Sequence, residues 1–237
     1  MELSFYRAPL PELPHPPIPL RMLRIVENAL VRAWEILRQP LRPGFDLVSA
    51  NENRVTDELR EVLCDEVLGR GLVDGFSQGM FIINRDAKFR NFDGSKRGLM
   101  PDLCVNLIDR PQVSVLSHDG LFIECKPVDA GHLVGSCYCD DGLIRFVKGE
   151  YAWAMQEAMM VGYVREDYTI SPKLNDALQA RNGTMRTVRV PSQCAKSKAT
   201  RFSECVCITK HGRAFEYVGT RQQAPPITIR HLWLRRD

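Results

Sequence analysis

The chain has 237 residues, 44% of them hydrophobic, which is enough to bury the core of one α/β domain. Its 32 Lys and Arg residues against 29 Asp and Glu give a net charge of +3, too small an excess to indicate nucleic-acid binding by itself. No stretch approaches the roughly 18 consecutive apolar residues of a membrane helix, and the N-terminus lacks the charged-then-apolar order of a signal peptide. Composition therefore argues against a membrane protein, and we expect a soluble, cytoplasmic one.

The N-terminal part of the chain is expected to form a Pro-rich arm and an accessory helix. Residues 8–19 are rich in proline, which predicts an extended segment laid on the surface of the protein or on a partner. Residues 20–38 place apolar side chains at helical spacing, and QPLRPG ends that pattern. We therefore divide the chain into an arm and helix at residues 1–45 and a main domain at residues 46–237.

A second amphipathic helix is predicted at residues 51–71, where two glycines end the apolar stripe. At about 100° per residue, Glu52 falls within that stripe at the start of the helix, whereas Glu58 and Glu61 fall well off it. The carboxylate of Glu52 is therefore expected to point inward.

Three strands are predicted next, at residues 81–84, 101–108 and 121–127. Residues 142–164 are too long for one strand and show helical periodicity, which predicts a helix that packs back on the sheet. Residues 171–181 begin with Ser-Pro, which predicts another helix. Later strands are expected at residues 186–190, 204–210, 214–218 and 227–234. This order predicts an α/β fold with a mixed central sheet flanked by helices.

Acidic residues occupy matching positions in two of these strands. In residues 121–127, Glu124 and Lys126 share one face, because side chains two positions apart in a strand point the same way. In residues 101–108, the same alternation places Asp102 on the face opposite the apolar side chains. Each strand is thus predicted to have one apolar face and one face that carries acid.

These positions indicate a metal-assisted chemistry. Asp102 and Glu124 on adjacent strands, with Glu52 from a helix, would form a hard oxygen site suited to Mg²⁺ or Mn²⁺. Such a metal activates water, orients it toward a phosphodiester and neutralises charge on the phosphoryl oxygens. Lys126, next to Glu124, would position the attacking water or stabilise the transition state as a fixed cation.

The same residues resemble a known pattern. MPD at residues 100–102 and ECK at residues 124–126 are similar to the Pro-Asp…(Asp/Glu)-x-Lys motif of the PD-(D/E)xK, or restriction-endonuclease-like, nuclease superfamily. The resemblance covers about residues 50–165, where the predicted order of helix, three strands and helix is also that of the family core. It implies a restriction-endonuclease-like core and a Mg²⁺-dependent phosphodiesterase acting on DNA, with residues 166–237 as a C-terminal extension.

The resemblance also implies a role for each residue of the motif. Asp102 and Glu124 would be metal ligands, Lys126 the catalytic lysine, and Glu52 the acidic residue that many members carry on the first core helix. Some members also carry a Gln or Tyr on the helix after the lysine. Candidates for that position are Gln156 and Tyr151.

The expected biological setting follows from the same resemblance. The chain contains little beyond the predicted core and no recognisable DNA-reading module. Sequence specificity would then come from loops, from a homodimer or from a protein partner. This arrangement suits an endonuclease that serves as the nuclease subunit of a prokaryotic antiviral defence or restriction system.

Plainer interpretations remain open for these residues. Glu124 and Lys126 could form a solvated strand face of alternating charge, and Glu52 could be a carboxylate favoured by the helix dipole. Arg145 and Lys148 in RFVKGEYAW could touch a phosphate backbone or belong to a solvated face. The same fold could also serve as a non-catalytic nucleic-acid-binding or scaffold protein, or as an RNA or nucleotide phosphodiesterase. The last third of the chain is rich in Lys and Arg, so a basic face is possible there.

The eight cysteines lie mostly in apolar, strand-like contexts, where free Cys behaves as a small hydrophobe. Reduced thiols therefore fit better than a disulfide framework. Two Cys-x-Cys pairs with histidines nearby raise the alternative of a zinc-binding regulatory protein. The residues concerned are Cys137, Cys139, Cys205, Cys207, His132 and His211. Structural zinc sites usually leave about two to four residues between cysteines, so the one-residue spacing favours two small apolar side chains on one strand face.

Overall fold

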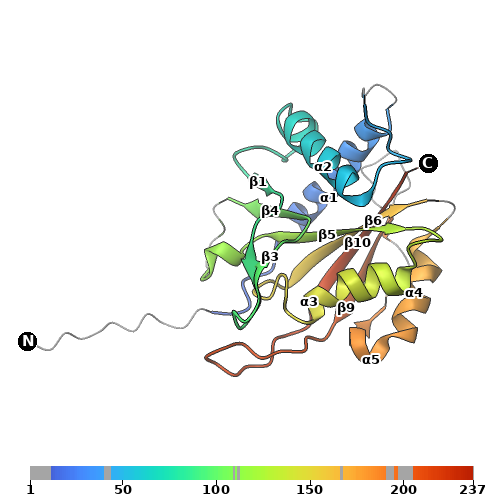
Figure 1. The fold of residues 1–237 in the computed structure, drawn as a ribbon. Coiled ribbons are helices and arrows are strands. Elements are labelled where there is room, and N and C mark those ends of the chain that lie inside the picture. The colour runs from blue at the N-terminus through green and yellow to red at the C-terminus, as the bar shows by residue number, and fades with distance from the viewer. Residues whose placement is uncertain are drawn as a thin grey trace, which may run out of the picture.

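The computed structural model describes residues 12–39, 44–108, 110, 113–165, 168–190, 195–196 and 205–236. Its centre is a mixed eight-stranded sheet with helices on both faces (Figure 1). The strands of this sheet are β1 (Phe81–Asn84), β4 (Leu103–Leu107), β5 (Leu121–Val128), β6 (Glu157–Val164), β7 (Thr187–Arg189), β8 (Ala195–Lys196), β9 (Cys205–His211) and β10 (Ile227–Arg235). A separate two-stranded hairpin joins β2 (Phe89–Arg90) to β3 (Arg97–Leu99).

The helices lie in two layers. On one face α1 and α2 cover the sheet, and α3, α4 and α5 lie on the other (Figure 1). The helical elements are α1 (Leu20–Leu37), α2 (Glu52–Glu61), η1 (Val62–Leu68), η2 (Leu116–His118), η3 (Val134–Leu143), α3 (Ile144–Val147), α4 (Ile170–Ala180) and α5 (Asn182–Met185). Within the described ranges, no helix combines the length and apolar character needed to cross a bilayer.

The sheet runs in the order β1-β4-β5-β6-β10-β9-β7, and β8 pairs with β9. Strands β1, β4 and β5 pair antiparallel, whereas β6 runs parallel to both β5 and β10. The predicted mixed α/β sheet flanked by helices is confirmed at this level. Residues 166–237, expected as an extension, supply β10, which lies inside the sheet between β6 and β9.

Most predicted elements are confirmed. The helices expected at residues 20–38, 51–71 and 171–181 correspond to α1, to α2 with η1, and to α4. The strands expected at residues 81–84, 101–108, 121–127, 186–190, 204–210 and 227–234 correspond to β1, β4, β5, β7, β9 and β10. Residues 214–218, expected as a strand, form only an isolated bridge between Glu216 and Gln223.

The prediction of one helix over residues 142–164 is wrong. Helical structure begins earlier, in η3, and ends with α3, after which β6 forms. Strand β6 is almost wholly buried and is hydrogen-bonded in parallel on both sides. A strand buried on both faces has a continuous apolar run without alternation, so its periodicity cannot be told from that of a buried helix.

The accessory helix α1 belongs to the main core. Trp34 stacks on Tyr163 of β6 with ring centroids 5.3 Å apart, and its indole N–H donates to the Arg235 carbonyl over 2.6 Å. Of the predicted Pro-rich arm, residues 8–11 lie outside the described residues. The rest packs against the chain itself, since His15 and Ile18 are buried and the His15 amide donates to Ala154 O over 2.8 Å.

The basic C-terminal third does not present all its cations to solvent. Arg213, Arg230 and Arg236 are buried, so the expectation of a basic face is wrong for these three. Arg230 pairs with a buried glutamate on α1, and Arg236 donates to the carbonyls of Leu47 and Ala50, each over 2.5 Å. Guanidinium groups can be buried when carbonyls and carboxylates satisfy their N–H groups. The contacts of Arg236 fix the segment that leads into α2.

A buried hydrogen-bonded network runs from α5 through the strands β9 and β10 to η3. The Nδ1 of His211 lies 2.8 Å from Met185 O and its Nε2 lies 2.7 Å from the Thr209 hydroxyl. That hydroxyl is also 2.8 Å from Nε2 of His231, whose Nδ1 is 3.0 Å from the Tyr138 hydroxyl. The carbonyl requires a proton on Nδ1 of His211, so Thr209 donates to its Nε2 and accepts from His231. Burial lowers the pKa of both histidines, which favours the neutral form of each ring.

This buried hydrogen-bonded network predicts a loss of stability in mild acid. Burial lowers the pKa of His211 from its usual 6.5 to about 4, so between these values the unfolded state binds more protons and the free energy of unfolding falls as the pH falls. We expect a loss on the order of 2 kcal/mol from His211 between pH 7 and pH 5, measured by urea unfolding. His211→Asn keeps a donor for Met185 O but cannot titrate, and should lose less. An equal loss in both proteins would contradict the assignment.

Candidate active site

Asp102 lies where two neighbouring strands part. The pairing between β4 and β5 ends at Leu103 and Ile123, so the N–H of Cys125 has no carbonyl opposite it on β4. Asp102 takes the place of that carbonyl, because Cys125 N–H donates to its Oδ2 over 2.7 Å. A backbone group on a buried strand needs such a partner. The carboxylate of Asp102 is thereby held beside the part of β5 that carries Glu124.

Glu124 and Lys126 lie inside the protein and not on a solvated strand face. Glu124 is only 2% exposed, and the side chain of Lys126 is 12% exposed. The Lys126 ammonium lies 3.2 Å from Oε1 of Glu124 and 2.8 Å from Oε1 of Glu52. The interpretation of this pair as an exposed face of alternating charge is wrong.

Glu52 reaches the site from the first turn of α2. The helix begins after Asn51, whose side chain accepts the N–H of Arg54 over 2.9 Å as an N-cap. Glu52 points toward Lys126, as its place in the apolar stripe predicted, while remaining partly exposed. Glu58, expected to lie off the stripe, is buried instead and pairs with Arg54 at 2.5 Å.

Arg145 and Tyr151 form the wall of the site beyond Glu124. Arg145 on α3 lies 3.7 Å from Oε1 of Glu124 and donates to the Tyr151 hydroxyl over 2.5 Å. That hydroxyl donates to Met100 O over 2.8 Å, two residues before Asp102. Of the two candidates left open by the sequence, Tyr151 therefore lies at the site, whereas Gln156 donates to the His15 carbonyl of the N-terminal arm.

The helix η3 covers the site closely because of one glycine. A Cβ added to Gly142 would lie 2.7 Å from Cε of Met160, 3.3 Å from Cγ of Lys126 and 3.7 Å from Cγ of Glu124. The first of these distances is shorter than a normal contact. Glycine at this position thus lets the helix backbone approach the face of β5 that carries Glu124 and Lys126.

The site concentrates charge in a poorly solvated space. Burial, followed by the negative charge of Asp102, raises the pKa of Glu124 to about 7, and burial also raises the pKa of Asp102. Burial disfavours the ammonium of Lys126, but Glu124, Asp102 and Glu52 outweigh it and raise its pKa. Within the described part of the chain, Oε2 of Glu124 is buried without a hydrogen-bond partner. The site therefore has carboxyl groups with raised pKa values and one buried carboxylate oxygen without a hydrogen-bond partner.

Two carboxylates of the site are placed so that they could serve as ligands of a hard cation. Asp102 and Glu124 offer oxygen ligands, and Mg²⁺ is usually held by one or two carboxylates with waters and substrate phosphates completing its shell. Glu52, predicted as a third ligand, is ion-paired with Lys126. No group of three or more His, Cys, Asp or Glu side chains among the described residues is arranged to hold a metal.

The first of the two Cys-x-Cys pairs differs from the expectation of a strand, whereas the second lies in β9 as expected. Cys137 and Cys139 lie in η3 and not on a strand. Cys207 is a buried residue of β9, while the side chain of Cys205 lies outside the described residues. His132 is engaged with a neighbouring aspartate, and His211 belongs to the buried hydrogen-bonded network above.

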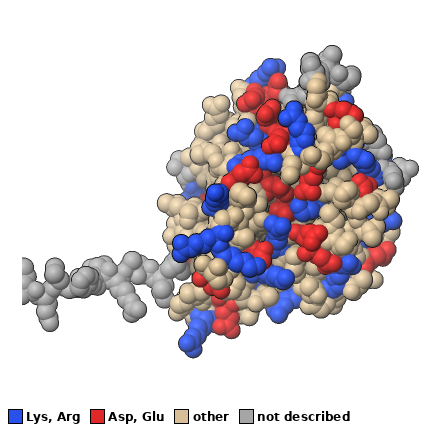
Figure 2. All heavy atoms as spheres, in the orientation of Figure 1, with Lys and Arg blue, Asp and Glu red and all other residues tan. Residues whose placement is uncertain are grey.

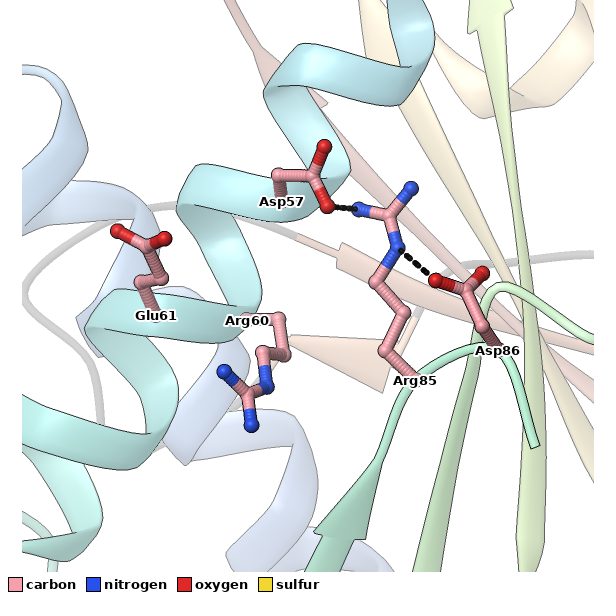
Figure 3. A pocket seen from close by; sticks show the side chains of 5 residues that line it. All are labelled: Asp57, Arg60, Glu61, Arg85 and Asp86. Atoms are coloured by element: carbon pink, nitrogen blue, oxygen red, sulfur yellow. Dashed lines mark ion pairs between the residues drawn. The ribbon is translucent and has the colours of Figure 1, made fainter.

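A polar hollow of about 240 Å³ lies between the C-terminal half of α2 and the residues that follow β1 (Figure 3). The side chains that line it are Asp57, Arg60, Glu61, Arg85 and Asp86. Arg85 pairs with Asp57 at 2.5 Å and with Asp86 at 3.6 Å, and its charge counteracts the rise in the pKa of Asp102. The charges of the hollow nearly cancel. We therefore interpret Arg85 as a tie between β1 and α2 beside the site.

Comparisons with models of protein families, with curated proteins and with solved structures found no match for this chain. The case for a function therefore rests on the side chains at the end of β5. Sequence reasoning named four of them: Glu52, Asp102, Glu124 and Lys126. It left Arg145 undecided, because only the folded chain brings α3 to within reach of Glu124.

The raised pKa of Glu124 predicts a pH-dependent cost to stability. A carboxyl group whose pKa rises from 4.5 to about 7 on folding favours the folded state below pH 4.5, and that contribution is lost as the pH rises through 7. Glu124→Gln resembles the protonated carboxyl and should stabilise the protein at pH 8 by about 1 to 3 kcal/mol in urea unfolding.

The gain from Glu124→Gln should shrink at pH 5, where the parent carboxyl is protonated. Glu61→Gln on the exposed side of α2 serves as the matched control for the substitution itself. A loss of stability in Glu124→Gln at pH 8 would show that Glu124 has a structural role.

Proposed function

We propose that this chain is a divalent-metal-dependent DNA nuclease that hydrolyses phosphodiester bonds, with an active site at Asp102, Glu124, Lys126 and Glu52. The observation that carries the proposal is the buried Glu124 and Lys126 pair on β5, toward which Asp102 and Glu52 converge from β4 and α2. These are the residue types and positions that the PD-(D/E)xK resemblance implies. The order α2, β1, β4, β5 and α3 also agrees with the order of the family core.

The cost of the site supports a function over a structural role. A buried carboxylate with one unpartnered oxygen destabilises a protein, and groups of this kind concentrate at functional sites. An apolar residue at position 124 would avoid this cost, since Phe122, the preceding residue on the same strand face, is itself fully buried. A carboxylate that can bind a cation explains the arrangement.

In this proposal each side chain has a separate task. Asp102 and Glu124 would hold Mg²⁺ or Mn²⁺, which when bound activates water and offsets charge on the phosphoryl oxygens. Lys126, fixed by Glu52, would place a permanent positive charge beside the scissile phosphate. Arg145 would hold the carboxylate of Glu124 in place, with Tyr151 fixing its guanidinium. Positioning by such contacts prepares the site before substrate binds.

The wider setting belongs to the proposal and rests on the resemblance. An endonuclease of this size would take its specificity from loops, from a second copy of the chain or from a protein partner. We propose a place as the nuclease subunit of a prokaryotic antiviral defence or restriction system.

Substitution of Asp102, Glu124 or Lys126 should remove most cleavage without unfolding the protein. Asp102→Asn, Glu124→Gln and Lys126→Met should each lower plasmid cleavage in Mg²⁺ or Mn²⁺ by at least about 100-fold, because each removes a ligand or the fixed cation. Glu52→Gln should lose less, since it acts through Lys126. Cleavage is followed on agarose gels, with EDTA as the metal-free control.

Asp57→Asn, in the neighbouring hollow, is the matched control and should keep full activity. Circular dichroism and thermal melts report on folding in every variant. Full activity in Asp102→Asn would refute the assignment. Cleavage of RNA or of nucleotides in place of DNA would keep the site and change its substrate.

Metal binding should be visible without any substrate. A cation that binds only the folded state stabilises it by mass action, so Mn²⁺ or Ca²⁺ at millimolar concentration should raise the Tm of the parent protein. Asp102→Asn and Glu124→Gln should abolish the shift, whereas the Asp57→Asn control should retain it. An equal shift in all four proteins would place the metal elsewhere.

A further inference from the structure

The β2–β3 hairpin exposes an unusual pair of cations. Arg90 and Arg97 lie directly opposite each other in its antiparallel register. The register skips Gly98, whose φ of +72° belongs to the left-handed region that glycine adopts readily. Both arginines are exposed, as is Lys88 two residues before Arg90. Residues opposite each other in such a pair point to the same side, so the two guanidinium groups share one face.

This hairpin lies on the same side of the sheet as the candidate active site. The ring of Phe89 packs edge-on against Phe122 of β5, with ring centroids 4.8 Å apart. Phe122 and Glu124 are two positions apart on one strand and therefore point to the same face. Beyond β3 the chain reaches Asp102 after only three residues. The exposed cations thus flank the side of the site that Glu124 faces.

The hairpin is held rigidly against the neighbouring loop. The Trp153 indole donates to Arg90 O over 3.1 Å, and the Phe92 amide donates to Gly149 O over 3.1 Å. Asn91, which is buried, donates to the Ser95 hydroxyl over 3.0 Å. A surface fixed in this way presents its charges at little further entropic cost on binding.

Acidic groups near the hairpin are already engaged elsewhere. Asp93 accepts from the amide and hydroxyl of Ser95 in the turn, and Glu150 pairs with Lys96. Among the described residues, Lys88, Arg90 and Arg97 take part in none of the ion pairs. Lys and Arg side chains gather over β3 on this face of the molecule (Figure 2).

A pair of like charges in direct opposition destabilises a hairpin. Solvation by water explains one exposed arginine but gives no reason for two cations opposite each other without an acidic neighbour. A polyanion that lies across the pair would turn the repulsion into two favourable contacts. Phosphates along a nucleic-acid strand provide such a ligand.

We propose that the β2–β3 hairpin binds the phosphate backbone of DNA through Arg90 and Arg97, with Lys88 beside them, and thereby places the scissile bond at Glu124 and Lys126. The inference rests on the proposed nuclease function for the identity of its ligand. It assigns binding of the DNA backbone to a surface separate from the residues that would catalyse hydrolysis. Contacts of this kind position the duplex without reading its sequence.

The test is binding of a fluorescein-labelled DNA duplex, followed by anisotropy without metal and with Ca²⁺. The double variant Arg90→Gln, Arg97→Gln should bind about 10-fold or more weakly, and the slope of log K against log salt should fall by about 2. The matched control Arg70→Gln, Lys173→Gln removes the same charge from exposed positions on other elements and should bind like the parent. Thermal melts of the hairpin variant should equal or exceed those of the parent, because the repulsion is gone.

The outcomes of this test separate the hairpin from the active site. Because binding is measured separately from cleavage, affinity that is lost in the hairpin variant and kept in the control supports the inference even if no protein cleaves. Unchanged binding in the hairpin variant would overturn it while leaving the nuclease proposal intact. An equal loss of affinity in the control would overturn it in the same way. A parent that binds RNA but no DNA would overturn the inference and would also change the substrate of the proposed nuclease.

Discussion

The ammonium group of Lys126 is the contact on which the candidate site depends. It lies within 3.2 Å of Glu124 on its own strand and within 2.8 Å of Glu52 on a helix packed over the sheet. Without this charge, the carboxylates of Glu52, Asp102 and Glu124 would repel one another in a space where water provides little screening. The positive charge of the lysine offsets part of the negative charge of these carboxylates. A divalent cation bound to Asp102 and Glu124 would offset more of the negative charge of the site.

The site also depends on two places where the packing leaves room: the end of the β4–β5 pairing and the missing side chain at Gly142. Strand β4 leaves β5 at Ile123, which frees the Cys125 amide for Asp102 and opens the sheet beside Glu124. On the other side, Gly142 lets η3 approach the same strand face without a side chain between them. The entry to α2 is fixed from a distance by Arg236, whose guanidinium binds carbonyls at Leu47 and Ala50. Positions far apart in the chain therefore determine where Glu52 and Asp102 lie.

Errors in the sequence predictions have a common physical origin. Strand β6 is covered on both faces, so it lacks the alternation that identifies β4 and β5 as strands, and its sequence predicts part of a helix. Arg213 and Arg236 lie in the Lys- and Arg-rich third of the chain where a basic face was possible, because charge usually means exposure, yet both are buried and donate to carbonyl groups inside the protein. In each case the local sequence predicts one degree of burial or one kind of element, and contacts with residues distant in sequence produce another.

The sequence by itself determined the residues of the site and their strands. The alternation around Glu124 and Lys126, the matching place of Asp102 and the stripe position of Glu52 follow from side-chain geometry within one element. Tertiary structure alone decided that Glu124 is buried with a raised pKa, and that Tyr151 and not Gln156 meets the site through Arg145. It also decided that Arg90 and Arg97 lie opposite each other in a hairpin that packs on β5. Burial and proximity depend on how elements pack, and no pattern within a single element records that packing.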